Sequence, residues 1–385
     1  MEWSKLLLFL GAGASKPFGI PTMSGFLSIF DKEVGDSPLY KAIKTAFKTN
    51  CDLEVLMTVI EDLSKSSGEF FRTISPQTSY FLINQENEEA KKYIHEESWK
   101  KRAGKLLDRI KTIIREECIK AISDDSRILE VYDDFFASLT EERNKMDSKK
   151  HWDSTQVTNS TMVLPSDFRI FTTNYDTCME VYFNQKEIGF SRGIVNKYGE
   201  NLLDVDSYEA PSSVDVRVFK LHGSVDLFEE KGKIRQLNVA GAKKTFLGHE
   251  YGKESMRWPI EFGGYKHIIE SPYLDLFRKL RDAAKKDSWW IVIVFSFRDR
   301  TICSLLNNVL SLKPKRDRPS ILLLDIHPEI IIKRLEDWDY PDLAKTIHPV
   351  EVQFGGQDLS KKLHDALLTK GYIKEISVST GKSAF

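Results

Sequence analysis

Five short apolar runs constrain the fold of this chain more than any other feature of its sequence. Each run is five to eight residues long, and each ends in a polar or glycine-containing turn. Continuous apolar runs of this length are typical of parallel strands that helices cover on both faces. The runs are LLLFL (6–10), FRIFTTN (168–174), VRVFKLHG (216–223), WWIVIVF (289–295) and SILLLDI (320–326).

Amphipathic stretches separate most of these runs. Residues 271–288 place four apolar side chains on one helical face, and residues 328–338 begin with Pro328, which favours the first turn of a helix. Strands that alternate with helices predict a doubly wound, mainly parallel α/β sheet of Rossmann-like type.

The segment from residue 27 to residue 164 has a different pattern. It is long and charged, and apolar side chains recur at helical spacing in residues 52–65 and 101–122. We therefore predict that residues 27–164 form an inserted helical subdomain and that residues 1–26 and 165–385 form the Rossmann-like domain.

Two later segments are expected to lie outside the main sheet. Residues 229–268 are rich in Gly and Lys and are expected to form a hairpin and loops. The basic run KPKRDRP (313–319) connects a predicted helix to a predicted strand and is expected to be a solvated loop.

Composition excludes several classes of protein. The 385 residues carry 56 Lys and Arg against 57 Asp and Glu, a net charge of -1, so no overall basic surplus points to direct sequence-specific binding of nucleic acid. No stretch approaches the roughly 18 consecutive apolar residues of a membrane span. The apolar run 6–10 is shorter than the roughly seven residues that a signal peptide needs, so we expect a cytoplasmic protein.

The four cysteines lie far apart in the sequence. Because no CxxC pair exists, the chain offers no zinc-ribbon ligands, and we expect no bound metal. A disulfide framework is also not expected at this density, which fits a reducing compartment. The cysteines are Cys51, Cys118, Cys178 and Cys303.

The first chemical motif is GAGAS (11–15), followed by GIP (19–21). A strand that runs directly into small residues brings backbone amide groups close to a bound diphosphate, and the next helix N-terminus adds partial positive charge. Gly11 and Gly13 would permit this close approach. The motif is not a Walker A loop, because no GK[ST] follows, and it lacks the third glycine of GxGxxG. A purely structural turn is the alternative.

Two further motifs follow predicted strands. TTNYD (172–176) places Thr173, Asn174 and Asp176 where a strand ends, which is where ligands bind in open α/β sheets. Asp176 could instead only cap the next helix. KLHGS (220–224) contains His222, and of the eight histidines His222 alone follows an apolar strand and precedes a small-residue turn. A structural histidine is the alternative there.

GAGAS with GIP, then TTNYD, then KLHGS, in that order, resemble the sirtuin-like superfamily. The stretch VFSFRDRTI (294–302) is similar to the family's later nucleotide-contacting loop, which commonly reads Gly-Tyr-Ser-Phe-x-Asp. Ser296, Arg298 and Asp299 match that pattern, while Val294-Phe295 replaces Gly-Tyr. The stretch LLLDIHP (322–328) resembles a strand that ends near the adenosine. The resemblance covers residues 1–26 and 165–335.

The chain also departs from sirtuin deacylases. The zinc ribbon with its two CxxC pairs is absent from the sequence, and Thr22-Met23-Ser24 replaces the Asp-Phe-Arg that follows GIP in deacylases. The pattern resembles instead the bacterial branch of sirtuin-like NAD-cleaving enzymes in anti-phage defence. In that branch nicotinamide is released, water takes its place, and cellular NAD falls until the infected cell stops growing, an abortive infection.

The resemblance implies a role for each candidate residue, with NAD as the substrate and no metal. Asn174 would position the ribose or the attacking water, His222 would act as a base or as a hydrogen-bond partner of a ribose hydroxyl or water, and Asp176 would contact the carboxamide or hold the loop. The residues implied to bind the nucleotide are Gly11, Ala12, Gly13 and Ser15 at the diphosphate, Thr173 at the strand end, and Ser296, Arg298 and Asp325 at the adenosine half.

Three functions therefore remain open. The first is an NAD glycohydrolase, and the second is a non-catalytic regulatory subunit that binds NAD or ADP-ribose. The third, a protein deacylase, is disfavoured by the missing zinc ribbon. An NAD hydrolase must be held inactive in its host, so we expect control by assembly: a homo-oligomer, or a separate partner contacting the helical insertion. The resemblance implies a HerA-type ring ATPase as that partner, or less readily a short Argonaute.

Overall fold

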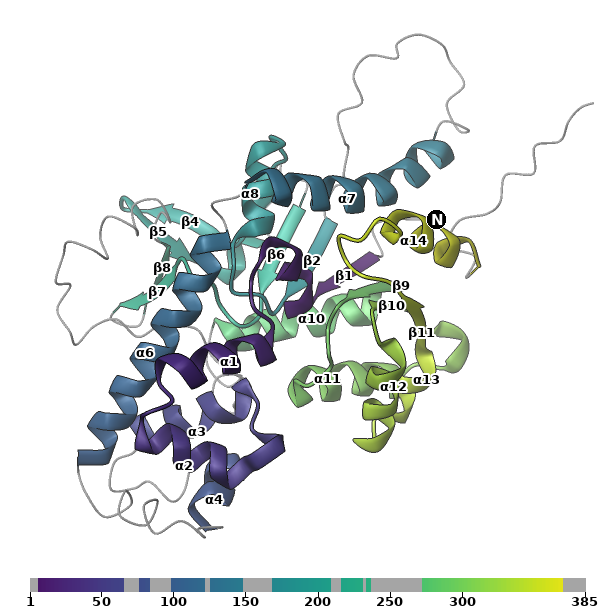
Figure 1. Ribbon diagram of the computed structural model, residues 1–385. Helices are drawn as coiled ribbons and strands as arrows, with labels where there is room; N and C mark the ends of the chain where they lie inside the picture. The colour runs from purple at the N-terminus through teal and green to yellow at the C-terminus, as the bar shows by residue number, and fades with distance from the viewer. Residues whose placement is uncertain are drawn as a thin grey trace, which may run out of the picture.

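A seven-stranded sheet lies at the centre of the computed structural model (Figure 1). The strand order is β11-β10-β9-β1-β2-β6-β3, and every neighbouring pair is parallel. The strands are β1 (Leu6–Leu10), β2 (Phe168–Thr172), β3 (Phe190–Ser191), β6 (Val216–Lys220), β9 (Trp289–Ile293), β10 (Ser320–Asp325) and β11 (Ile347–Glu351). The structure describes residues 6–65, 76–83, 98–121, 125–147, 168–208, 216–230, 233–236 and 272–369.

Strand β1 has a neighbour on each side, and its five residues are all buried. Alternate side chains of a strand point to opposite faces of the sheet. Accordingly Leu6, Leu8 and Leu10 join one hydrophobic core, and Leu7 and Phe9 join a second core on the other face. The prediction of a doubly wound, mainly parallel sheet is thus confirmed, and the five apolar runs are β1, β2, β6, β9 and β10.

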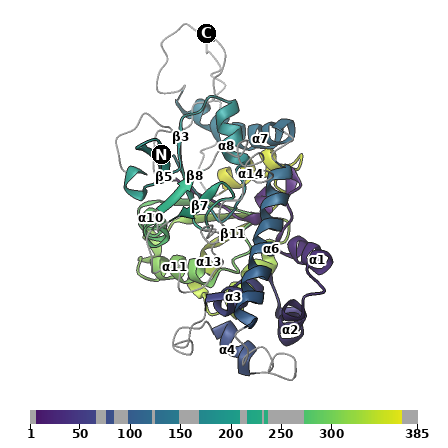
Figure 2. The ribbon, with the colours of Figure 1, turned by 90° about the vertical axis from the view of Figure 1, so that its left-hand side faces the viewer.

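Helices cover both faces of the sheet (Figures 1 and 2). The face that receives Leu7 and Phe9 packs against four helices, all of which contribute buried side chains to that core. These helices are α10 (Tyr273–Lys286), α11 (Arg300–Ser311), α12 (Pro328–Asp337) and α13 (Pro341–Thr346). Pro328 opens α12, as its position in the sequence predicts.

The other face carries the remaining helices. Between β1 and β2, every element that the structure describes is helical, and these helices share one hydrophobic core with the sheet. Figure 2 shows α6 extending from the sheet past α1 toward α3, with which it packs. The helices are α1 (Met23–Glu33), α2 (Pro38–Phe47), α3 (Leu53–Lys65), α4 (Pro76–Ile83), α6 (Ser98–Ala121), α7 (Asp125–Asp147), α8 (Cys178–Gln185) and α14 (Leu359–Thr369).

The division of the chain into a Rossmann-like domain and a helical subdomain stays a prediction. The helical pattern of residues 52–65 and 101–122 matches α3 and α6, but the expected boundary at 164–165 lies outside the described residues. Because the helices bury their apolar faces in the same core as the sheet, they are part of its packing as well as an insertion in its sequence.

A second, four-stranded antiparallel sheet has the order β4-β5-β8-β7. Its strands are β4 (Ile194–Lys197), β5 (Glu200–Leu203), β7 (Leu227–Glu230) and β8 (Lys233–Gln236). The expected hairpin of the 229–268 segment begins with β7 and β8, and residues 237–268 lie outside the described residues. The basic run 313–319 joins α11 to β10 through a short 3-10 turn (Lys315–Asp317).

The topology places the carboxyl ends of all seven parallel strands at one edge of the sheet. From β1 the chain continues to β2 on one side, and β9 returns on the other side. This reversal next to β1 is the point at which open α/β sheets bind their ligands. In the part of the chain that the structure describes, no helix combines the length and apolar character needed to cross a bilayer.

Candidate active site

A cavity of about 230 Å³ lies beyond the carboxyl ends of β1, β2, β6, β9 and β10. The loops after these strands form one side, and α1, α3 and α6 close the other side, so the helical segment contributes directly to the cavity. Its lining consists of Ala12, Gly13, Ser15, Ile20, Pro21, Thr22, Met23, Ser24, Phe26, Leu53, Cys118, Thr173, Asn174, Tyr175, Asp176, His222, Val294, Phe295, Ser296, Arg298, Asp299 and Asp325.

The structure brings ten of the eleven predicted site residues together around this cavity, although they come from five separate loops. The exception is Gly11, which packs behind the lining. The ten are Ala12, Gly13, Ser15, Thr173, Asn174, Asp176, His222, Ser296, Arg298 and Asp325. Their individual roles stay predictions.

Three polar side chains form a hydrogen-bonded chain at the centre of the site. The Ser15 hydroxyl donates to Asp176 Oδ2 at 2.6 Å and accepts from Asn174 Nδ2 at 2.8 Å. Asp176 Oδ1 accepts from the backbone amide of Cys178 at 3.0 Å, so this carboxylate also supports the start of α8. Asp176 thus lines the cavity and also supports the first residue of α8, while its contact with a ligand stays a prediction.

This chain of hydrogen bonds fixes the side-chain amide of Asn174. Because Ser15 gives its only proton to Asp176, it can only accept from Asn174, and the nitrogen of the amide must face it. Asn174 Oδ1 is then left without a hydrogen-bond partner among the described residues, although Asn174 is 9% exposed. A buried oxygen without a donor favours a ligand or water that supplies one.

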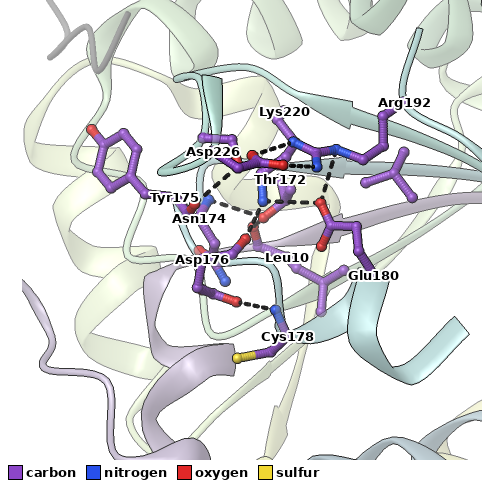
Figure 3. Close-up of polar contacts among 12 residues, drawn as sticks. Leu10, Thr172, Asn174, Tyr175, Asp176, Cys178, Glu180, Arg192, Lys220 and Asp226 are labelled. Carbon is purple, nitrogen blue, oxygen red and sulfur yellow. Dashed lines mark hydrogen bonds and ion pairs between the residues drawn. The ribbon is translucent and has the colours of Figure 1, made fainter. Parts of the chain in front are cut away.

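Polar contacts with neighbouring strands hold the loop Asn174-Tyr175-Asp176 in place (Figure 3). Thr172 Oγ1 donates to the carbonyl oxygen of Leu10 and accepts from the backbone N–H of Asn174, each at 3.0 Å, which ties the ends of β1 and β2 together. The Lys220 ammonium group donates to the carbonyl oxygen of Asp176.

The turn after β6 holds the same loop from the other side. The amide of Val225 donates to the carbonyl oxygen of Tyr175 at 2.9 Å, and Ser224 Oγ donates to the same oxygen at 3.2 Å. The stretch KLHGSV therefore has two functions, since it places His222 in the cavity and positions the Asn174 loop.

A buried cluster of ionic side chains lies behind this loop (Figure 3). Arg192 makes a bidentate pair of hydrogen bonds to Asp226, at 2.7 and 3.0 Å. Its Nε lies 3.0 Å from Glu180 Oε1. Lys220 Nζ lies 3.2 Å from the same Glu180 oxygen. All four side chains are almost completely buried, and a buried charge requires such partners.

The pKa values of this cluster reflect the pairing. Burial alone would raise the pKa of Asp226, but the Arg192 guanidinium outweighs it and holds that pKa well below its usual range. Burial would lower the pKa of Arg192, but Asp226 and Glu180 raise it. Arg115, on α6, has its pKa lowered to about 10 by burial, with Asp226 opposing that shift.

His222 contacts a carboxylate on the far side of the cavity. Its Nε2 lies 2.9 Å from Asp299 Oδ2, and both side chains are buried. Asp299 immediately precedes α11, and its other oxygen accepts from the amides of Thr301 and Ile302 at 2.8 and 3.1 Å. The site thereby combines an imidazole with an orienting carboxylate.

The two glycines of GAGAS are required by contacts within the chain. A Cβ at Gly11 would lie 2.4 Å from Phe295 Cα, and one at Gly13 would lie 2.0 Å from Val294 Cγ1. The Gly11 and Gly13 amides donate to the carbonyl oxygens of Ile293 and Val294. In this conformation these two amides are therefore not available to a diphosphate, so close packing against the loop after β9 is a sufficient reason for glycine at both positions.

The rim beside β9 and β10 carries two cations and one acid. Arg334 donates to the carbonyl oxygen of Ser296 at 2.6 Å, and its pKa is lowered by burial and by the neighbouring Arg298. Asp325 Oδ1 accepts from the amide of His327 at 2.8 Å, so one of its oxygens supports the turn into α12. Among the described residues, no group of three or more His, Cys, Asp or Glu side chains has a metal-binding arrangement.

The sequence motifs assign no role to several residues of the site. Asp299 matches the family's loop pattern, but only its distance to His222 reveals a role, while Lys220 and Asp226 lie in and beside the KLHGS motif. Arg192 follows β3, a strand of only two residues that no apolar run predicts, and it carries no motif, so no signal in a single sequence would have found it.

The fold and the cavity define a Rossmann-like α/β protein with a polar site at the switch point of its sheet. Residues 169–340 match the family model of the SIR2-like domain, so the chain carries a sirtuin-like domain over this span, which contains the Asn174, His222 and Asp299 loops. The resemblance to the sirtuin-like family is thereby confirmed over residues 169–340, while its anti-phage branch stays a prediction. A comparison with curated proteins finds no match.

Solved Sir2 structures are among the proteins with detectable structural similarity. One is a Sir2 structure from work on the structural basis for the mechanism and regulation of Sir2 enzymes. It is 12% identical to this chain, the match covers 94% of this chain and 91% of that chain, and the TM-score is 0.38. Another is Sir2 bound to acetylated peptide: 11% identity, coverage of 96% and 94%, and a TM-score of 0.36. A third, Sir2 with p53 peptide and NAD+, has 11% identity, the same coverage and a TM-score of 0.35. These scores are too low to carry an argument about this chain.

Proposed function

We propose that this protein is an NAD glycohydrolase, which breaks the bond between nicotinamide and ribose and releases nicotinamide and ADP-ribose. The observation that carries the proposal is the meeting of Asn174 and His222 at one cavity of a SIR2-like domain. Asn174 offers a buried carbonyl oxygen without a partner among the described residues, and His222 offers an imidazole with an orienting carboxylate.

The chemistry of breaking the nicotinamide–ribose bond explains why Asn174 and His222 are useful there. When the bond between the anomeric carbon and nicotinamide breaks, its electron pair leaves with nicotinamide, and positive charge develops on the sugar. Fixed dipoles and oriented water stabilise such a charge and its capture. Asn174 Oδ1 would accept a hydrogen bond from a ribose hydroxyl or from the attacking water. His222 would take the proton that the water loses as its oxygen bonds to the anomeric carbon, because imidazole can accept protons near neutral pH.

The biological setting is proposed from the sequence resemblance. Such an enzyme would act in the cytoplasm and deplete cellular NAD during phage infection, and its activity would be controlled by assembly. Self-association and a HerA-type ring ATPase are the proposed forms of control, with the helical insertion, residues 27–164, as the contact surface. Light scattering of the protein alone and with the ATPase tests this, and a fully active monomer that binds no partner would contradict it.

Nicotinamide release, measured by chromatography after incubation with NAD, tests the activity directly. The wild-type protein, alone or with its partner, should form nicotinamide and ADP-ribose in equal amounts. Asn174→Ala and His222→Ala should each reduce turnover by about 100-fold or more, the usual contribution of a catalytic proton acceptor or dipole. Asn196→Ala is the matched control, because Asn196 is exposed and bonds only to Asn201 across the β4–β5 hairpin among the described residues.

The possible outcomes separate the candidate functions. Wild-type turnover in both site variants would contradict the proposal. Measurable binding of NAD that stays intact with every partner would favour the regulatory subunit, and consumption of acyl-lysine peptide coupled to NAD would favour a deacylase.

A further inference from the structure

Asp299 makes three hydrogen bonds that use both of its oxygens. Oδ1 accepts from the first-turn amides of Thr301 and Ile302, and Oδ2 lies 2.9 Å from His222 Nε2. Asp299 is 4% exposed and His222 is 8% exposed, so little water competes for this contact. The residue therefore links the start of α11 to the imidazole across the cavity.

We propose that Asp299 is a positioning residue that holds His222 with its proton on Nε2, so that Nδ1 is the nitrogen that accepts a proton from water. This inference rests on the proposed function.

The hydrogen-bond pattern favours this tautomer. An ionised carboxylate can only accept, so the atom that faces it across 2.9 Å must be a donor, which requires a proton on Nε2. A neutral imidazole carries one proton, so Nδ1 is then the acceptor. The N-terminus of α11 favours negative charge at Asp299, because two backbone amides and the helix dipole point toward it.

The step that this arrangement serves is balanced in atoms and electrons. The electron pair of the carbon–nitrogen bond leaves with nicotinamide, and a water oxygen bonds to the anomeric carbon. The proton of that water passes to His222 Nδ1 and then to solvent, while the Nε2 proton stays in its hydrogen bond to Asp299. The imidazolium that exists in between lies next to an anion, which stabilises it.

A purely structural Asp299, which only caps α11, is the competing interpretation. Asp299→Asn distinguishes the two, because Asn also caps helices well but presents an amide donor toward Nε2. That donor favours the opposite tautomer, with the proton on Nδ1. Asp299→Ser is a second cap-retaining variant that removes the partner of His222 altogether.

Kinetics and histidine NMR together test the proposal. In Asp299→Asn, kcat for nicotinamide release should fall about 100-fold or more, while KM stays within about threefold, because the loss concerns proton transfer. Ser37→Ala is the matched control: Ser37 caps α2 by accepting from the Tyr40 amide, so its loss weakens a helix start without touching the site, and kcat should not change.

The tautomer is read from 15N shifts of the His222 ring, assigned with His222→Gln. The wild-type ring should carry its proton on Nε2 and the Asp299→Asn ring on Nδ1. A wild-type ring protonated on Nδ1, or wild-type kcat in both Asp299 variants, would overturn the proposal. If the wild-type protein releases no nicotinamide under any condition, the proposed function fails, and the ring shifts still decide whether Asp299 sets the tautomer.

Discussion

Ser15 and Asp176 lie 161 positions apart in the chain, and their side chains are joined by a hydrogen bond of 2.6 Å at the centre of the cavity. Ser15 is 1% exposed, and its oxygen also accepts from Asn174. The serine of the GAGAS motif therefore orients the amide of Asn174. The resemblance implies a direct contact between the Ser15 hydroxyl and a diphosphate. To donate to a diphosphate, Ser15 would have to give up its hydrogen bond to Asp176, because a hydroxyl has only one proton.

Replacement of Ser15 by alanine should leave two buried polar groups without a partner, Asp176 Oδ2 and Asn174 Nδ2. We expect the free energy of unfolding to fall by about 1–3 kcal/mol and nicotinamide release to fall with it, because the Asn174 amide is no longer fixed. Urea unfolding and chromatography measure both effects. Ser28→Ala, which removes a solvent-facing hydroxyl from α1, is the control. Wild-type values of both quantities in Ser15→Ala would contradict this account.

Asp226→Asn should destabilise the protein strongly, because Arg192 would keep its buried charge with only Glu180 beside it. Removing one partner of a buried ion pair typically costs about 3–5 kcal/mol. Glu33→Gln provides the comparison, since the Glu33–Arg109 pair is about half exposed and its loss should hardly change the unfolding midpoint. Equal shifts of the unfolding midpoint in the two variants would contradict the view that the buried ion pair is costlier to break than the exposed one.

The fold could be predicted because its strands are buried on both faces. Each apolar run became a strand, and the rule that parallel strands present their carboxyl ends at one edge brought Asn174 and His222 to one cavity. Arg192 could not be predicted, because it pairs with Asp226, 34 positions later, and nothing local in the sequence marks it. Its position follows from tertiary packing alone.

The two glycines of GAGAS also show that tertiary contacts cannot be predicted from a single sequence. The sequence predicts that GAGAS holds a diphosphate, and three of its residues line the cavity. The structural reason for Gly11 and Gly13, however, lies in residues 294 and 295, which are far away in the sequence. A single sequence cannot tell a glycine that makes room for a ligand from one that makes room for another loop of the chain.

Asp287 provides a test of pH dependence away from the site. It is completely buried at the end of α10, and burial raises its pKa to about 6 although Arg169 Nη2 lies 2.6 Å away. The folded state thus binds this proton more tightly than the unfolded state, whose pKa is near 3.8. The contribution of Asp287 to the free energy of unfolding therefore falls as pH rises from about 4 to about 6. Above that range the ionised carboxylate destabilises the folded state by a constant amount.

The side chain in Asp287→Asn cannot ionise, so the folded variant contains no buried carboxylate charge at this position. We expect its free energy of unfolding, relative to that of the wild-type protein, to rise between about pH 4 and pH 7 and to level off above. Denaturant titrations at several pH values provide the measurement. Asp282→Asn, at an exposed position of the same helix, should show no such trend. A difference between Asp287→Asn and wild type that is the same at every pH would refute the assignment.

Val294 has a backbone conformation that suits glycine better than valine. Its φ is +43°, a region that β-branched residues rarely adopt. Its side chain also fills the space into which a Cβ at Gly13 would project. Val294→Gly should therefore be tolerated, since the relief of backbone strain offsets the loss of a partly buried side chain.

The same contact predicts a rescue. Gly13→Ala alone should lower the melting temperature and abolish nicotinamide release, because its Cβ would lie 2.0 Å from Val294 Cγ1. The double variant Gly13→Ala with Val294→Gly should recover most of both, since the colliding atoms are gone. Gly11→Ala should not be rescued by Val294→Gly, because its nearest neighbour is a backbone atom, Phe295 Cα at 2.4 Å. If the double variant is as defective as Gly13→Ala alone, the glycine is required for something other than this packing, and a bound diphosphate becomes the leading explanation.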